Sequence, residues 1–183
     1  MTEHALFRER QHFRQIWLWV LLLAIALISW WGAVQQVVLG IPFGTNPGPD
    51  WMAVLIALVF GTVFPLFFTV LALQVEVRGD GLYYRFFPFH LRYRRIGWNE
   101  TVAYAPVSYS PLSSYGGWGI RWGAGGKAYN VAGNLGVRFC LADGRKILFG
   151  SADPSGFAEA VQVASGIGAD PSGVCDNSHR PFS

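Results

Sequence analysis

Two apolar stretches decide the fold of this chain: residues 16–39 read IWLWVLLLAIALISWWGAVQQVVL, and residues 51–73 read WMAVLIALVFGTVFPLFFTVLAL. Between residues 16 and 73 there is no Lys, Arg, His or Glu, and the single acidic residue is Asp50. A helix rises about 1.5 Å per residue, so each stretch is long enough to cross a hydrocarbon core of roughly 30 Å. The segment between them, residues 40–50, is rich in Gly and Pro and predicts a loop. The sequence therefore predicts a two-helix transmembrane hairpin over residues 16–73.

Arginines lie on both sides of this hairpin but not in its loop. They are Arg8, Arg10 and Arg14 before the first stretch, and Arg78, Arg85, Arg92, Arg94 and Arg95 after the second. Cytoplasmic segments that flank membrane helices carry an excess of Lys and Arg. We therefore expect a multi-pass protein of the inner (plasma) membrane, with both termini cytoplasmic and the loop 40–50 outside. Residues 1–15 then form a cytosolic N-terminal segment.

Small residues repeat at about four-residue spacing in both stretches: Ala26, Ser29 and Ala33 in the first, and Ala53, Ala57 and Gly61 in the second. Small side chains let membrane helices approach each other closely. These stripes either hold the hairpin together, which we favour, or contact a protein partner or a second copy of this chain through Ala53, Ala57 and Gly61.

After residue 73 the pattern changes from helical to alternating, with turn signals every eight to twelve residues, as in an antiparallel β domain. The expected strands are residues 74–78, 82–87, 91–96, 101–105, 119–122, 127–131, 136–141 and 145–149. Pro154, at a helix start, and the apolar spacing after it predict one amphipathic helix that ends near Gly166. We thus expect an α+β membrane protein with a β domain over residues 74–166. Residues 167–183 have little apolar surface to bury and are expected to form a disordered tail.

Catalytic and cofactor patterns are weak throughout the chain. Gly123–Lys127 lies in a loose match to a dinucleotide-binding loop, but a strand-like segment follows it and not a helix. The histidines (His4, His12, His90 and His179) show no metal-ligand spacing, and His90 reads as a turn or strand residue. Cys140 and Cys175 have neither metal nor redox spacing and are expected to be reduced thiols. We expect no enzymatic activity, no cofactor, no metal and no nucleic-acid partner.

Two groups of residues are candidate binding surfaces. Arg92, Arg94 and Arg95 form a basic cluster that either contacts lipid headgroups or, as we favour, serves topology and adhesion to bulk lipid. The second group, within an aromatic-rich segment that is longer than a strand connection needs, contains Trp118, Arg121, Trp122, Lys127 and Tyr129. Such aromatic and Arg residues either anchor a protein interface or pack into the sheet core.

The words GWGIRW (117–122), GKAYNVAGN (126–134), GVR (136–138) and DGRK (143–146) resemble a family of small, uncharacterised prokaryotic membrane proteins. That resemblance implies a pleckstrin-homology-like (PH-like) β domain attached to a two-helix membrane hairpin, and it implies no activity. We expect a membrane-anchored, non-enzymatic binding or scaffolding module on the cytoplasmic face of the lipid bilayer. The alternative is an oligomeric membrane protein, either a pore or a complex subunit, that its β domain regulates.

Overall fold

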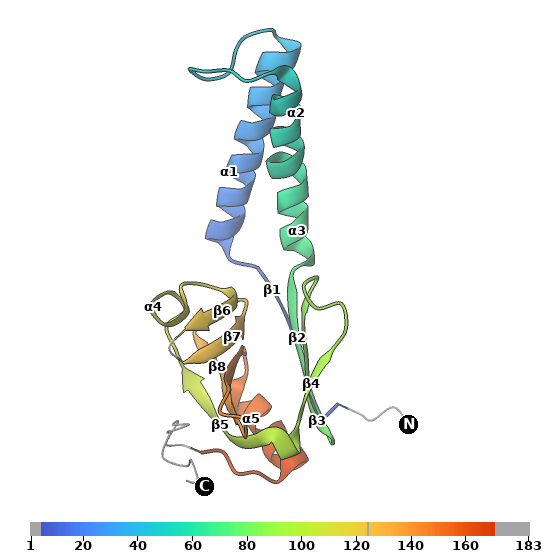
Figure 1. The fold of residues 1–183 in the computed structure, drawn as a ribbon, viewed down its shortest axis with the longest axis vertical. Coiled ribbons are helices and arrows are strands. Elements are labelled where there is room, and N and C mark those ends of the chain that lie inside the picture. Colours follow the sequence, from blue (N-terminus) through green and yellow to red (C-terminus); the bar gives the residue numbers. More distant parts are fainter. Residues whose placement is uncertain (1–4, 124, 171–183) are drawn as a thin grey trace. The chain divides into compact units, whose positions relative to one another are not determined.

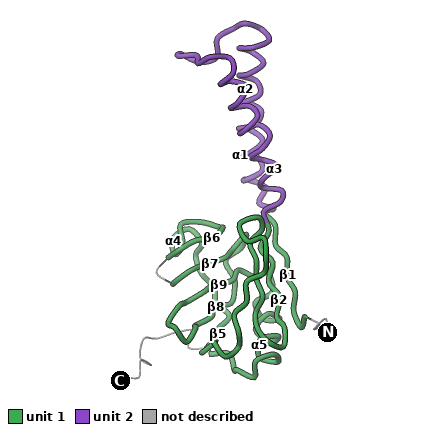
Figure 2. The backbone as a smooth tube through the Cα atoms, turned by 45° about the vertical axis from the view of Figure 1, so that its right-hand side comes forward, with its two compact units in different colours: residues 1–12, 72–183 green, residues 13–71 purple. Residues whose placement is uncertain are grey.

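The computed structural model describes residues 5–123 and 125–170 and shows an α+β protein with an apolar helix pair and two β-sheets (Figure 1). It divides into two compact units (Figure 2). The helix unit is residues 13–71, and the β unit comprises the described parts of residues 1–12 and 72–183. The helix unit is therefore inserted into the chain of the β unit, and the two units are described in turn.

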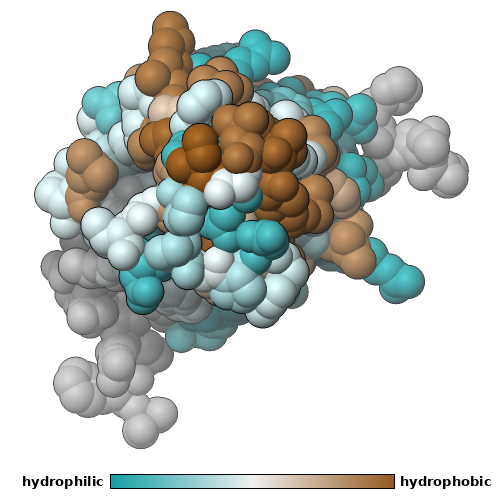
Figure 3. Space-filling model, turned by 90° about the horizontal axis from the view of Figure 1, so that it is seen from above, coloured by the Kyte–Doolittle hydropathy of each residue, from teal (hydrophilic) through white to brown (hydrophobic). Residues whose placement is uncertain are grey.

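The helix unit contains the two expected helices. The first is α1 (Ile16–Ala33), which continues as a π-helical stretch, Val34–Val38; the second is α2 (Asp50–Leu58), a π-helical stretch (Val59–Val63) and α3 (Phe64–Val70). Both are long and apolar enough to cross a membrane. The second helix is shorter than expected because residues 72 and 73 belong to a strand. At the loop end, apolar side chains lie beside polar ones (Figure 3).

The π-helical stretch of the second helix directly precedes Pro65, which lies in the first turn of α3. Proline has no N–H to donate, and its ring clashes with the carbonyl four residues earlier, here that of Gly61. A wider turn removes that clash without breaking the helix. The sequence of the second helix thus explains where its hydrogen-bonding pattern changes.

Small residues lie where the two helices touch. Ala57 is completely buried, and a Cβ added to Gly61 would come within 2.6 Å of the Trp30 ring. On the first helix, Ala26 and Ala33 are buried as well. The structure therefore uses Ala57 and Gly61 inside the hairpin, in the way that the favoured interpretation of the stripes predicts.

The β unit contains two sheets. The first is an antiparallel meander of β1 (Phe7–His12), β2 (Ala72–Arg78), β3 (Gly81–Phe87) and β4 (Arg94–Gly97), in that order. The second has the order β5 (Thr101–Ser108), β8 (Leu135–Leu141), β9 (Lys146–Gly150), β7 (Gly126–Asn130) and β6 (Gly119–Gly123). β7 and β9 pair in parallel, so this sheet is mixed and not purely antiparallel as expected.

The first strand, β1, was not predicted from the sequence. It pairs with β2 from His12 opposite Ala72 to Phe7 opposite Val77. Phe7 stacks on Phe157 at a centroid distance of 5.1 Å, and the Glu9 carboxylate accepts hydrogen bonds from the Ser151 hydroxyl and the Ala152 amide. The expected division into a separate cytosolic segment, residues 1–15, is therefore wrong for residues 7–12, which belong to the β unit.

Three helical segments complete the β unit. A short 3₁₀ helix (Trp98–Glu100) joins the sheets, and α4 (Pro111–Tyr115) lies in the long connection between β5 and β6. The predicted C-terminal helix is α5 (Pro154–Ser165), capped by the Asp153 carboxylate, which accepts from the Gly156 amide, and followed by Gly166 with φ of 71°. Phe157 and Val161 on α5 are fully buried, and α5 contacts strands of both sheets.

Two further expectations differ from the structure. The strand expected at residues 91–96 is limited to Arg94–Gly97, because the chain before it forms a loop. Cys140 is disulfide-bonded and not a reduced thiol; Cys175 lies outside the described residues. Of the expected tail, residues 171–183 also lie outside them, whereas the Asp170 amide donates to the Tyr104 carbonyl at 2.9 Å.

The position of β1 predicts how the β unit behaves when the helix unit is removed. Residues 5–12 joined to residues 72–170 by an Asn-Gly turn should fold as a soluble β protein, since this turn suits a two-residue hairpin. A fragment that begins at Ala72 lacks the Phe7 ring and the Glu9 hydrogen bonds, and its thermal midpoint should fall by at least about 10 °C. Circular dichroism measures both. Equal midpoints would show that β1 is dispensable.

Candidate functional site: a basic cleft

A cleft of about 460 Å³ opens in the β unit where residues of both sheets meet. Tyr84 of β3 and Arg94 of β4 line it from the first sheet. The second sheet contributes residues from β6, β7 and the start of β9, namely Trp122, Gly123, Gly126, Lys127, Tyr129, Lys146 and Ile147, together with Gly144 and Arg145 of the preceding turn. The site is thus assembled from five strands and one turn.

Strand alternation explains why these side chains converge. Arg94 lies opposite Tyr84 in the β3–β4 register, and Trp122 lies opposite Lys127 in the β6–β7 register, so each pair shares a face. Tyr129 is two residues beyond Lys127 and shares its face. Gly126 has φ of 94°, and a Cβ there would come within 2.2 Å of the Lys146 carbonyl oxygen. Glycine therefore permits β7 to approach β9 closely at the cleft.

The cleft combines aromatic rings with an ammonium group. The Lys127 Nζ lies 4.9 Å from the ring centroid of Trp122 and 4.9 Å from that of Tyr129, within range of cation–π attraction. Burial lowers the pKa of Lys127, and the charges of Arg94 and Arg145 lower it further, against an opposing effect of Tyr84. Lys127 is therefore a partly buried ammonium group with two other cations, Arg94 and Arg145, close by.

The two tyrosines of the cleft remain protonated at neutral pH. Burial raises the pKa of Tyr84 to about 12, with a further contribution from Tyr129. Burial also raises the pKa of Tyr129, although its interaction with Tyr84 and the charge of Arg94 act in the other direction. Both phenols thus offer hydrogen bonds and neutral ring surface.

Positive charge in the cleft exceeds negative charge. The basic side chains are Arg94, Lys127, Arg145 and Lys146. Arg145 forms an exposed ion pair with Asp143 at 2.5 Å. For the other three, no carboxylate within residues 5–123 and 125–170 lies close enough to form an ion pair. An anion that entered the cleft would meet three cations without a carboxylate partner.

The cleft contains part of each predicted surface, the basic cluster and the aromatic group, and the other members of both lie elsewhere. Of the basic cluster, only Arg94 lines the cleft. Arg95 lies on the opposite face of β4, where its guanidinium pairs with Asp80 at 3.3 Å, and Arg92 is exposed in the loop before β4. The basic cluster is therefore not a single surface.

The aromatic group is divided in the same way. Trp122, Lys127 and Tyr129 line the cleft, with Tyr129 almost fully buried and stacked on Phe149. Arg121 lies on the other face of β6, opposite Ala128, and its Nε donates to the Trp118 carbonyl. The Trp118 indole in turn donates to the Gly133 carbonyl, away from the cleft lining.

Sequence reasoning missed the three other polar side chains of the cleft: Tyr84, Arg145 and Lys146. The signal for the last two was the basic pair directly after the Asp143-Gly144 turn, which places both side chains at the start of β9. Tyr84 lies on the same face of β3 as Leu82 and Phe86, and this two-residue spacing is typical of side chains that point into the core. Its position beside Arg94 depends on pairing with β4.

His90 borders the cleft from within the core. It is 8% exposed, and its Nδ1 accepts a hydrogen bond from the Phe86 amide at 3.3 Å. Burial lowers the pKa of His90, and the charges of Arg94 and Lys127 add to the effect. The imidazole is therefore neutral at neutral pH and serves as a local acceptor. Across the part of the chain that the structure describes, no three His, Cys, Asp or Glu side chains gather as metal ligands would.

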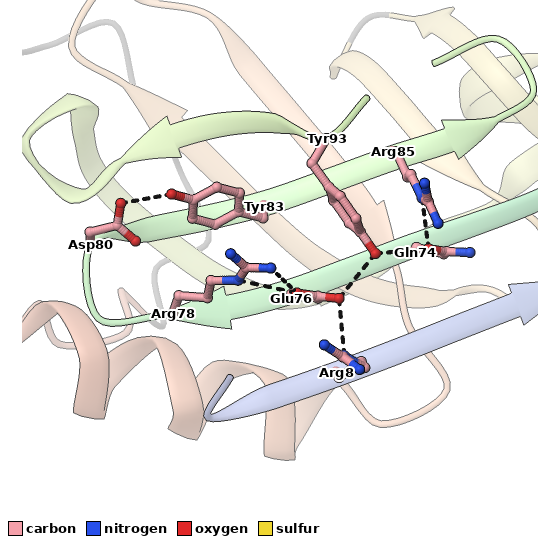
Figure 4. A network of polar contacts seen from close by, with 8 residues as sticks. All are labelled: Arg8, Gln74, Glu76, Arg78, Asp80, Tyr83, Arg85 and Tyr93. Atoms are coloured by element: carbon pink, nitrogen blue, oxygen red, sulfur yellow. Dashed lines mark hydrogen bonds and ion pairs between the residues drawn. The ribbon is translucent and has the colours of Figure 1, made fainter. Parts of the chain in front are cut away.

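A second polar cluster lies on the opposite face of the first sheet and surrounds Glu76 (Figure 4). The buried Glu76 carboxylate forms ion pairs with Arg8 of β1 at 3.0 Å and with Arg78 at 2.6 Å, and it accepts a hydrogen bond from Tyr93. Tyr93 comes from the loop before β4 and also donates to Gln74. The cluster thus ties β1 and this loop to β2.

The partners of this carboxylate predict how Glu76 responds to acid. Burial alone would raise the pKa of Glu76, but the hydrogen bonds from Arg78 and Tyr93 and the charge of Arg8 hold it below the ordinary value. A lowered pKa means that this contribution to stability is present above the pKa of the unfolded chain and is lost as pH falls through the folded one. Glu76→Gln should destabilise the β unit by about 1–3 kcal/mol at neutral pH, and the loss should shrink toward about pH 3.

Thermal unfolding of the full chain in detergent at the two pH values measures this difference. Glu159→Gln is the matched control, since Glu159 is exposed on α5. A loss for Glu76→Gln that is equal at both pH values would contradict the assigned role of its charge.

One family model matches this chain. Residues 2–166 match the model described as "Family of unknown function (DUF6141)". No match was found among curated proteins or among solved structures. The family match spans β1, the helix unit, both sheets and α5. Because it covers nearly the whole chain, the protein belongs to this family of unknown function, DUF6141.

Proposed function

We propose that this protein is a membrane-anchored, non-enzymatic binding module whose β unit takes up an anionic ligand in the basic cleft. The observation that carries the proposal is the group of cations, Arg94, Lys127 and Lys146, that line one cleft without a carboxylate partner among the described residues. Lys127 and Lys146 are partly buried, and cations that are partly buried normally have an anionic partner. Arg94 is exposed and adds its charge at the same cleft. A bound anion would supply the missing partner.

The helix unit supports the membrane anchor. Its outward side chains are large and apolar; Leu27 is 71% exposed and Leu58 46% exposed. In water this surface would be unfavourable, whereas in a bilayer lipid would cover it. The arginines that flank the helices favour a multi-pass membrane protein with both termini cytoplasmic. The resemblance to small prokaryotic membrane proteins is the reason to propose the plasma membrane of a prokaryotic cell. The β unit would then face the cytoplasm. The disulfide at Cys140 argues against this side of the membrane, because disulfides are rare in the reducing cytosol.

Two features favour binding over catalysis. Tyr84, with a pKa of about 12, keeps its proton at neutral pH, and the His90 Nδ1 already accepts a backbone hydrogen bond. Neither group is poised to transfer a proton near neutral pH. Two sheets that pack with a C-terminal helix also suit a PH-like binding domain, the fold that we propose for this unit. The oligomeric alternative has less support, because Ala57 and Gly61 are occupied within the hairpin.

Cysteine labelling in intact cells tests the anchor and its orientation. Asn46→Cys in the loop should react with a membrane-impermeant thiol reagent, and Ser113→Cys, exposed on α4, should react only after the cells are opened. Wild type is the control for background labelling. Labelling of position 113 but not of position 46 in intact cells would reverse the topology.

Site-specific photo-cross-linking in native membranes tests binding at the cleft. A photoreactive residue at Trp122, which lines the cleft, should capture a ligand. The same residue at Arg121, on the opposite face of β6, should not, because both positions are exposed but only one faces the cleft. Mass spectrometry identifies the adducts. Equal capture at the two positions, or none at either, would refute the binding role of the cleft.

A further inference from the structure

The chemistry of the cleft limits what its ligand can be. Four basic side chains converge there, and only Arg145 has a carboxylate partner within the described ranges. One carboxylate on a ligand would balance one of the remaining three charges. A phosphate group carries one to two negative charges and several strong acceptor oxygens, so it can contact several cations at once.

We infer that the cleft binds the phosphate group of an anionic lipid headgroup, with Arg94 and Lys127 as its principal contacts. This inference rests on the proposed function and specifies the ligand of the same site. Arg94 approaches from the first sheet and Lys127 from the second, so a phosphate between them would link the two sheets. Arg145 and Lys146 supply further positive charge at the start of β9.

The lining of the cleft favours the headgroup of a lipid over its acyl chains. About 460 Å³ of open cleft accommodates a phosphate and a small polar substituent. The cations and the two protonated phenols supply the polar half of its wall, which suits a headgroup. Acyl chains would stay in the bilayer.

Trp122 favours a lipid over a phosphate compound that is free in solution. Its side chain lines the cleft and is 74% exposed. An exposed indole beside basic residues is typical of side chains that lie at the level of lipid headgroups. The exposed part of the Trp122 ring would gain apolar contact at that level, which it lacks in water.

The covalent tether strengthens the same choice. Residues 13–15 alone separate β1 from α1, and residue 71 alone separates α3 from β2. Three extended residues span only about 10 Å, so both covalent links between the units are short. With the helices in a bilayer, the β unit would meet headgroups at a high effective concentration. A site of modest affinity would therefore be occupied.

Neighbouring arginines provide a matched test. Arg94 and Arg95 are adjacent in β4, carry the same charge and are both exposed, but only Arg94 lines the cleft. Lys127 and Arg121 form a second such pair across the β6–β7 hairpin. General attraction to a negative surface depends on all four charges alike. A specific site depends on Arg94 and Lys127.

The experiment is native mass spectrometry of the full chain in detergent, titrated with phosphatidic acid and, separately, with phosphatidylcholine. Arg94→Ala and Lys127→Ala should each weaken phosphatidic acid binding about tenfold, since each removes a charge-assisted contact. Arg95→Ala and Arg121→Ala should change it less than about twofold. Phosphatidylcholine, which has no net charge, should not distinguish the variants. Arg94→Gln and Lys127→Gln, which remove the charge but keep a long polar side chain, replace any alanine variant that fails to fold, with the same expected loss.

Four outcomes are informative. A selective loss in the cleft variants supports the inference, and an equal loss in all four shows general charge attraction and overturns it. Glycerol phosphate in solution is the competing arm: if it binds wild type as tightly as the lipid does, the ligand is a free phosphate compound and the lipid source is wrong. If photo-cross-linking at Trp122 captures only protein, the headgroup inference fails while the binding function stands.

Discussion

The pairing of β1 with β2 is the constraint on which the rest of this structure depends. His12 lies opposite Ala72, so the whole helix unit is a connection between two neighbouring strands. A connection of this length costs closure entropy if it is disordered. Here the antiparallel helices bring their own ends together, and contacts such as that of Gly61 with Trp30 hold them there. The helix pair thus brings residues 13 and 71 close together, and the pairing of β1 with β2 requires the same closeness.

The cleft depends on this arrangement indirectly. The Glu76 cluster fixes β1 and the loop before β4 to β2, and β4 is the strand that carries Arg94. On the other side, Gly126 allows β7 to approach β9, and so places Lys127 near Arg145 and Lys146. Charges of one sign repel each other, and the openness of the cleft to water reduces the cost. The crowding of positive charge in this cleft therefore costs less free energy than it would in a closed interior.

The sequence was informative where structure depends on local patterns. Apolar length predicted both helices, alternation predicted most strands, and Pro154 with Gly166 marked the ends of α5. β1 was missed because its six residues, FRERQH, contain one apolar side chain and no alternation, as an edge strand held by a single neighbour permits. Arg94 and Lys127 were assigned to different surfaces because only the packing of two sheets brings them together. The prediction of a reduced thiol at Cys140 was wrong as well, because Cys140 is disulfide-bonded.

The insertion of the helix unit between β1 and β2 also sets the order in which the protein can fold during synthesis. β1 leaves the ribosome first, and its partner strand follows only after residues 13–71 have been made. Throughout that interval β1 has an unpaired backbone, which is a hazard for association with other chains. Its sequence meets this hazard, because Arg8, Glu9, Arg10 and Gln11 keep the waiting strand soluble. The polar side chains of β1 made it hard to predict as a strand. The same side chains keep it from associating with other chains before β2 has been synthesised.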